Sequence, residues 1–230
     1  MAESTSSTDK KSTGSRIFAN VELIVVIFLG IVSVATAYTS FQSGLYGGHS
    51  DDKISQSEAS GTLAESLYLE GNQQYVQDAQ TVLRLAELNI DAQSADPVTA
   101  ADAAGKYDEI YFIGVSEDLD AAIQSAAALD ESEPDFYHYP LDEDSYLQAR
   151  FSGYEDEAAY SESLREEGNQ LGAAGDQLGF YTALMAITLF LLGIAAVVRA
   201  PRMKWILIAI GMTIFTVTAI MTATIPFVWI

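Results

Sequence analysis

Three long apolar runs constrain what this chain can fold into more than any other feature of its sequence. They cover residues 17–41, 178–198 and 205–230, and Glu22 is the only charged residue within them. A helix rises about 1.5 Å per residue and the hydrocarbon layer of a bilayer is about 30 Å thick, so each run can cross a membrane as a helix. The runs therefore predict an all-α integral membrane protein with three transmembrane helices in a lipid bilayer.

The first run also has features of a secretory signal, because basic residues precede it and Ala35-Thr36-Ala37 imitates a cleavage site. However, the run is longer than the apolar part of a usual signal and continues through Tyr38 to Phe41. We therefore expect residues 17–41 to be an uncleaved anchor. Residues 1–16 are polar and are predicted to form a disordered cytoplasmic tail.

The positions of the basic residues predict how the spans are oriented. Basic residues close to the ends of spans favour the cytoplasmic side. The sequence thus predicts a multi-pass protein of the cell (inner or plasma) membrane, with a cytoplasmic N-terminus and residues 42–177 on the extracytoplasmic side. The residues that carry this prediction lie before the first span (Lys10, Lys11 and Arg16) and in the short link 199–204 between the second and third spans (Arg199, Arg202 and Lys204).

The predicted outer region, residues 42–177, is strongly acidic. It holds 29 of the 32 acidic residues but only five basic ones, a net charge of −24. Such a surface repels nucleic acid, so nucleic acid is not an expected partner. The charge fits either a solvated surface adapted to salt or a surface that attracts cations or a basic partner. Because the chain has no cysteine, packing alone has to stabilise this region.

Helical patterns predict that the outer region is an antiparallel helical hairpin inserted between spans one and two. One arm leaves the first span, the other returns to the second, and a small cap of helices and turns lies between them. This cap includes a helix whose N-cap is Ser116 or Asp118. Gly168, Gly172 and Gly175 predict a loose or bent returning arm. On the first arm, apolar residues at helical spacing share one face that we expect to pack: Leu63, Leu67, Tyr75, Ala79, Leu83, Ala86 and Ile90.

Motifs for chemistry are absent from the sequence. It has no cysteine, no G-x-S-x-G nucleophile elbow and no glycine-rich phosphate loop, and its only histidines are His49 and His138. His49 precedes Asp51 and Asp52, but no histidine pair has the spacing of a zinc site. We therefore expect no enzymatic activity, no catalytic residue, no cofactor and no metal site.

Glu22 is the one ionisable residue in the predicted spans. Counting inward from Tyr38 puts its carboxylate at the cytoplasmic rim, on the side that Arg199, Arg202 and Lys204 also reach. We expect a structural clasp in which Glu22 pairs with this basic link and holds span one against spans two and three. There are two alternatives for Glu22: it is an unpaired glutamate at the membrane interface, or it handles protons or ions.

Two segments, VELIVVIFLGIVSVATAYTSFQSGLYGGHS and GNQLGAAGDQLGFYTALMAITLFLLGIAAVVRAPRMKWIL, carry a resemblance together with the terminal TATIP. They resemble a group of uncharacterised bacterial membrane proteins with three spans. Tyr46 stands where that group usually has Trp, and residues 95–140 depart more from it. The group has no assigned activity, so the resemblance implies the three-span architecture and no mechanism. The matching positions are Glu22, Gln42, Gly175, Asp176, Phe190, Gly193 and Pro226.

These features favour a non-enzymatic interaction or scaffolding component of the cell envelope, either a homo-oligomer or a complex with other membrane proteins. The alternative is a subunit of an oligomeric cation pore or transporter, in which the acidic outer mouth concentrates cations and Glu22 lines a path. Three spans do not easily enclose a pore alone, so this alternative requires a symmetric oligomer.

Overall fold

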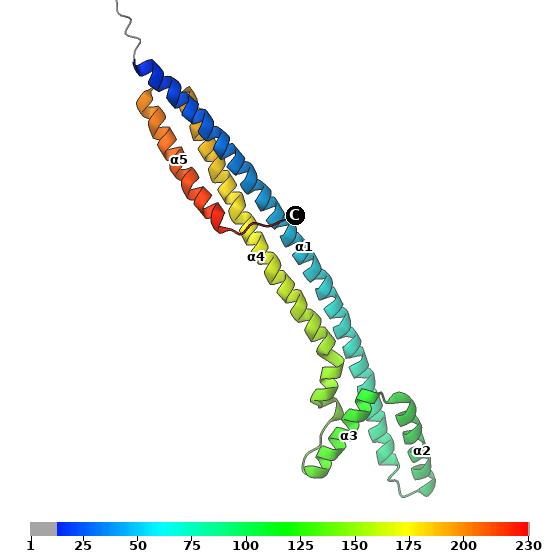
Figure 1. Cartoon of the computed structure of the whole chain (residues 1–230). Helices are drawn as coiled ribbons and strands as arrows, with labels where there is room; N and C mark the ends of the chain where they lie inside the picture. Colours follow the sequence, from blue (N-terminus) through cyan, green and yellow to red (C-terminus); the bar gives the residue numbers. More distant parts are fainter. Residues whose placement is uncertain (1–12, 230) are drawn as a thin grey trace, which may run out of the picture. The chain divides into compact units, whose positions relative to one another are not determined.

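The computed structural model of the chain describes residues 13–229, with side chains from Val21 onward, and all of its regular elements are helices (Figure 1). They are α1 (Thr13–Asp91), α2 (Pro97–Gly114), α3 (Glu117–Ser132), the 3₁₀ turn η1 (Pro140–Asp142), α4 (Asp144–Val197) and α5 (Pro201–Thr224). Among the described residues, α1, α4 and α5 each contain a stretch long and apolar enough to cross a membrane. The predictions of an all-α fold and of three membrane-length helices are confirmed.

The chain divides into two compact units, and α1 and α4 each contribute to both. The apolar unit comprises the described residues up to Ile54 and from Glu166 onward, and it contains the three membrane-length stretches. The acidic unit comprises residues 55–165, with 24 acidic and four basic residues. Neither α1 nor α4 is interrupted at the predicted span ends, residues 41 and 178, so the backbone itself does not mark where a span would end.

In the apolar unit, α1, α4 and α5 lie side by side (Figure 1). Their shared core consists of aliphatic and sulfur-containing side chains: Val21, Val25 and Val32 from α1, Met185, Leu192 and Ala195 from α4, and Ile208 from α5. Most apolar side chains on the other faces of these helices are exposed, including Val34, Phe190 and Ile220. Apolar residues around the whole circumference of a helix are typical of a helix that contacts lipid.

Glycines bring α1 and α4 close together in the apolar unit. A Cβ atom added at Gly168 would lie 2.9 Å from the Ile54 side chain, and one at Gly175 would lie 3.3 Å from the Tyr46 Cβ atom. Because the helices approach so closely, the Ser43 hydroxyl on α1 donates to the carbonyl oxygen of Gly175 over 2.8 Å. The glycines do not loosen the returning arm as predicted, because α4 is one continuous helix, and small residues here serve contact between helices.

The link and the end of the third span also differ from the prediction. The break between α4 and α5 covers only residues 198–200, so Arg202 and Lys204 lie in the first turns of α5 and not in a link 199–204. The third helix was expected to reach residue 230, but α5 ends at Thr224 because the residue before Pro226 is disfavoured in a helix. Of the predicted tail 1–16, residues 1–12 lie outside the described part, and α1 begins at Thr13.

In the acidic unit, local capping explains where the short helices begin. The carboxylate of Asp96 accepts hydrogen bonds from the backbone N–H groups of Val98 and Thr99, and Pro97 occupies the first turn of α2. Ser116 caps α3, which confirms one of the two predicted caps. Parts of α1 and α4 pack against α3 and η1 around a small core of Val82, Leu119, Ala122, Leu141 and Tyr146.

The predicted packing face of α1 in the acidic unit is wrong for several residues. Leu63, Leu83 and Ile90 are exposed rather than packed. Small and polar residues occupy much of the buried interface because they allow helices to approach closely, so counting apolar residues selected the wrong face. The residues that α1 buries in this unit are Ser57, Ser60, Ala64, Gly71, Asp78, Val82, Leu85 and Leu88.

Candidate functional site

The structure places one residue of the predicted basic link next to Glu22. The Nζ atom of Lys204 on α5 lies 3.8 Å from the Oε1 atom of Glu22 on α1. The two side chains differ in environment, since that of Lys204 is 5% exposed and that of Glu22 is 65% exposed. At this distance the contact is an ion pair rather than a hydrogen bond. It joins the first and third membrane-length helices, as the clasp hypothesis expects.

Arg199 and Arg202 do not share this contact. Both are exposed, and among the described residues neither lies within ion-pair distance of an acidic group. Lys204 differs because it begins the buried stripe of α5, which continues through Ile208 and Gly211. A buried ammonium group in a membrane span is costly unless a partner compensates its charge. Because Lys204 lies on this buried stripe, a pair with Glu22 is favoured over an ammonium group without an acidic partner.

A second polar contact ties the segment after α5 to α1. The side chain of Gln42 donates to the carbonyl oxygen of Val228 over 3.2 Å and accepts from the N–H group of Val228 over 3.1 Å. The Tyr46 hydroxyl donates to the carbonyl oxygen of Pro226 over 2.8 Å. Gln42 and Tyr46 are both buried. These side chains satisfy backbone groups of a segment that forms no helix and therefore cannot pair them along the chain.

The same segment closes one side of a cavity of about 460 Å³ in the apolar unit. Tyr38 and Thr39 of α1, Met185 of α4 and Phe227 are among its lining residues. Thr222 also lines it, and its buried hydroxyl has no hydrogen-bond partner among the described residues. Thr39 donates instead to the carbonyl oxygen of Ala35 over 2.9 Å. The lining is mainly apolar and contains no titratable group other than the Tyr38 phenol.

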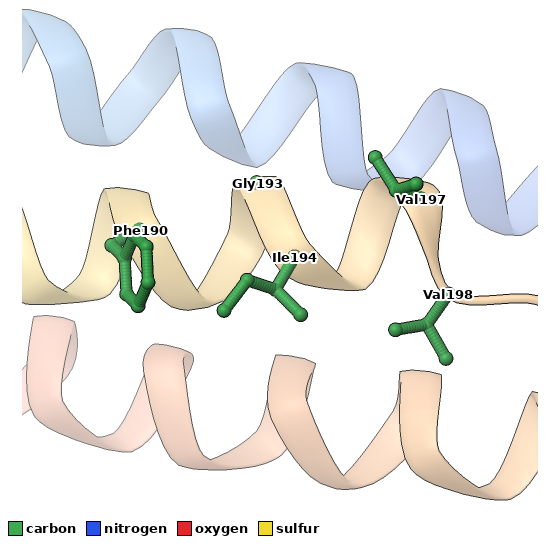
Figure 2. Close-up of a pocket in the computed structure, with 5 residues that line it drawn as sticks. All are labelled: Phe190, Gly193, Ile194, Val197 and Val198. Carbon is green, nitrogen blue, oxygen red and sulfur yellow. The ribbon is translucent and has the colours of Figure 1, made fainter.

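Figure 2 shows a groove of about 480 Å³ on α4, near its end, lined by Phe190, Gly193, Ile194, Val197 and Val198. The ribbons of α1 and α5 run on either side of these side chains. Every lining residue is apolar, so the groove offers contact to a hydrocarbon chain and no group that could orient a polar ligand. Phe190 and Gly193, which carry part of the sequence resemblance, thus lie on a surface suited to lipid.

In the acidic unit, a buried polar group joins α1 to α4. The Tyr146 hydroxyl donates to the Oδ2 atom of Asp78 over 2.6 Å, and the Gln74 amide donates to the Oδ1 atom over 2.8 Å. Asp78 and Tyr146 are each about 1% exposed. Burial, with the hydrogen bond to Asp78 as a second cause, raises the pKa of Tyr146 well above its ordinary value. Tyr146 therefore keeps its proton and acts as a donor at neutral pH.

Arg150 extends this polar group to α3. Its guanidinium donates to the Oδ2 atom of Asp118 and lies 5.8 Å from the centre of the Tyr146 ring, within range of a cation–π contact. The arrangement holds three helices together and leaves no activated nucleophile or exposed acid–base pair at its centre. Among the described residues, no cluster of three histidine, cysteine or acidic side chains is arranged to hold a metal ion.

Sequence reasoning did not identify Asp78 or Tyr146. A signal for Asp78 was present, because Ala64, Gly71, Asp78 and Leu85 follow one another at seven-residue intervals and all four are buried. For Tyr146 no pattern in the sequence distinguishes it from the other tyrosines of the same region. Gln42 and Tyr46 had been noted through the resemblance alone, without a structural role.

The acidic unit also exposes large apolar side chains. Phe112 and Ile113 at the end of α2, and Phe136 and Tyr137 before η1, are each more than two-thirds exposed. Exposed apolar groups that occur in pairs on a highly charged unit suggest surfaces that other molecules cover.

Comparison with known protein families, with curated proteins and with solved structures finds no match for this chain.

Proposed function

We propose that this chain is a non-enzymatic interaction or scaffolding component of the cell membrane, with its acidic unit on the extracytoplasmic side. The exposed apolar side chains of the acidic unit carry this proposal. Phe112 and Ile113 gain nothing from contact with water, so a unit that keeps them exposed is expected to bury them against a partner.

Orientation and topology are part of the proposal. The basic residues before the first span and around the α4–α5 link favour the cytoplasm. With three spans, the segment between the first and second then lies outside, as an antiparallel helical hairpin formed by α1 and α4. The paired hydroxyls of Ser57 and Ser161 support this arrangement, since each donates to the other residue's carbonyl oxygen, over 2.7 and 2.8 Å.

Membership of the group of three-span bacterial membrane proteins is likewise a proposal. Three of the positions that carry the resemblance make contacts within the apolar unit: Gln42 binds Val228, Pro226 accepts from Tyr46, and Gly175 lies against α1. A group that shares these residues would share the fixed C-terminal segment and the close pairing of α1 with α4.

Co-purification from native membranes tests the proposed function. The wild-type chain, extracted in mild detergent, is expected to carry associated proteins or further copies of itself, and a double substitution of Phe112→Ser and Ile113→Ser is expected to lose part of them. Glu109→Gln on the exposed side of α2 is the matched control and should retain them. A wild-type chain that is monomeric and carries no partner would refute the proposal. Cation flux through the purified chain in liposomes would support the pore subunit instead.

A further inference from the structure

One face of α1 in the acidic unit carries a regular apolar stripe that nothing within the unit covers. Leu69, Val76, Leu83 and Ile90 follow one another at intervals of seven residues, and each is between 48% and 69% exposed. We call these four residues the heptad stripe. Sustained seven-residue spacing of large apolar residues is the pattern by which one helix packs along another in a coiled coil.

The positions beside the stripe fit such a contact. Ala79 and Ala86 lie three residues after Val76 and Leu83, the positions that alternate with the stripe in a coiled-coil seam. Ala86 is exposed, whereas Ala79 is partly buried against the core of the acidic unit, and both side chains are small enough to let a second helix approach closely. A groove of about 460 Å³ runs beside the same residues, with Val76, Leu83, Ala79 and Ala86 on one wall and Tyr137 among the other lining residues.

Charge distinguishes this face from the rest of the acidic unit. From Gly71 to Leu83, α1 has one charged residue, Asp78, and it is buried. The exposed polar residues next to the stripe are amides, including Asn72, Gln73 and Gln80. An amide both donates and accepts hydrogen bonds, so Asn72, which lies three residues after Leu69 and therefore in the seam, can pair with Asn72 of an identical helix. Two copies of a unit with 24 acidic and four basic residues repel each other at most orientations, but least where the stretches from Gly71 to Leu83 meet. Glu87, which lies next to Leu83 on the same face, is paired with Arg84 of its own helix over 2.9 Å.

Membrane insertion settles the relative direction of two copies. Copies that insert in the same orientation present their α1 helices in parallel, whichever side of the membrane the acidic unit occupies. In a parallel pair related by a twofold axis, each residue of the seam faces the same residue of the other copy. The heptad stripe, its alanines and Asn72 are all compatible with being their own partners.

From these observations we propose that the heptad stripe is a homodimer interface, in which α1 of a second copy packs parallel and in register along Leu69, Val76, Leu83 and Ile90. The proposal deepens the proposed function and rests on it, since it names the surface and the partner through which the chain associates. Phe112 and Ile113 lie outside this interface and stay available to other partners.

Disulfide trapping tests the interface directly, because the chain has no cysteine of its own. Val76→Cys and Leu83→Cys, each oxidised in native membranes, are expected to give a covalent dimer at twice the 24.8 kDa mass of the chain. Gln77→Cys is the control, since it is exposed on the same helix but turned about 100° away from Val76, and it should stay monomeric. Equal trapping at positions 76 and 77, or no trapping at 76 and 83, would overturn the proposal.

A second pair of variants separates the interface from the fold. In the Val76→Cys background, Leu83→Glu is expected to abolish the dimer, whereas Leu63→Glu, at an exposed leucine of the same helix outside the stripe, should leave it intact. If trapping fails while the chain still carries other proteins from native membranes, the stripe proposal falls and the proposed function stands. If position 76 is trapped but the acidic unit proves cytoplasmic, the proposed orientation falls and the interface stands.

Discussion

Replacing Gly71 with alanine should destabilise the acidic unit, against the usual effect of this substitution in a helix. Alanine is favoured over glycine in a helix interior by about 1 kcal/mol. At Gly71, however, the added Cβ atom would lie 2.6 Å from the backbone oxygen of Arg150 and 3.1 Å from the ring of Phe151. Backbone cannot move aside cheaply, and overpacking of this kind costs about 1–3 kcal/mol. We therefore expect Gly71→Ala to be up to about 2 kcal/mol less stable than the wild type.

Gly105→Ala is the matched control for this prediction. Gly105 lies in α2 of the same unit, is exposed, and has nothing within 4 Å of an added Cβ atom. It should gain the full helix-propensity benefit of about 1 kcal/mol, so the two variants should differ by about 1–3 kcal/mol. For a chain of 230 residues, 1 kcal/mol moves the Tm by about 2–4 °C.

Thermal unfolding followed by circular dichroism, in one detergent and at one pH, measures both variants. The expected order of Tm is Gly105→Ala highest, wild type next and Gly71→Ala lowest, with several degrees between the two variants. If Gly71→Ala raised the Tm as much as Gly105→Ala, the close approach of α1 and α4 at Arg150 would be refuted.

Three further substitutions test the polar contacts. Glu22→Gln removes the charged partner of Lys204 and should lower stability in detergent. The loss should not exceed about 1 kcal/mol, because the Glu22 side of the pair is exposed, and an unchanged Tm would argue against the clasp. Gln42→Ala removes two hydrogen bonds to the segment after α5, which together stabilise it by about 1–3 kcal/mol. Carboxypeptidase should therefore digest this segment faster in the variant than in the wild type, and equal digestion would contradict the contact. Tyr146→Phe takes a buried donor from Asp78 and should cost about 1–3 kcal/mol in thermal unfolding; a neutral result would show that water or another group replaces the hydroxyl.

The sequence was sufficient to predict the helical class and the number of membrane-length helices. Long runs without charge depend only on the difference between water and hydrocarbon, which each residue reports independently of its neighbours in space. The contact of Glu22 with the basic residues also had a sequence basis, since counting inward from Tyr38 brought both to one end of the spans. The structure adds that Lys204, rather than Arg199 or Arg202, lies beside it.

The pairing of α1 with α4 could not be predicted in the same way. Contact between these helices depends on small and polar residues, such as Gly71, Ser57 and Gly175, and their effect appears only when the facing helix is known. Apolar spacing on α1 instead indicated Leu83 and Ile90, which the structure leaves exposed. The same limit applies to Gln42, whose two partners belong to a segment 186 residues further along the chain.

The most direct test of the account is the side of the membrane on which the acidic unit lies. Two single-cysteine variants suffice, because the chain has no cysteine: Gly105→Cys in α2 and Ala200→Cys between α4 and α5, both at exposed positions. In intact cells, a maleimide that cannot cross the membrane should label position 105, whereas position 200 should react only after the cells are permeabilised. Labelling of position 200 in intact cells, or protection of position 105, would contradict the proposed topology and the function built on it.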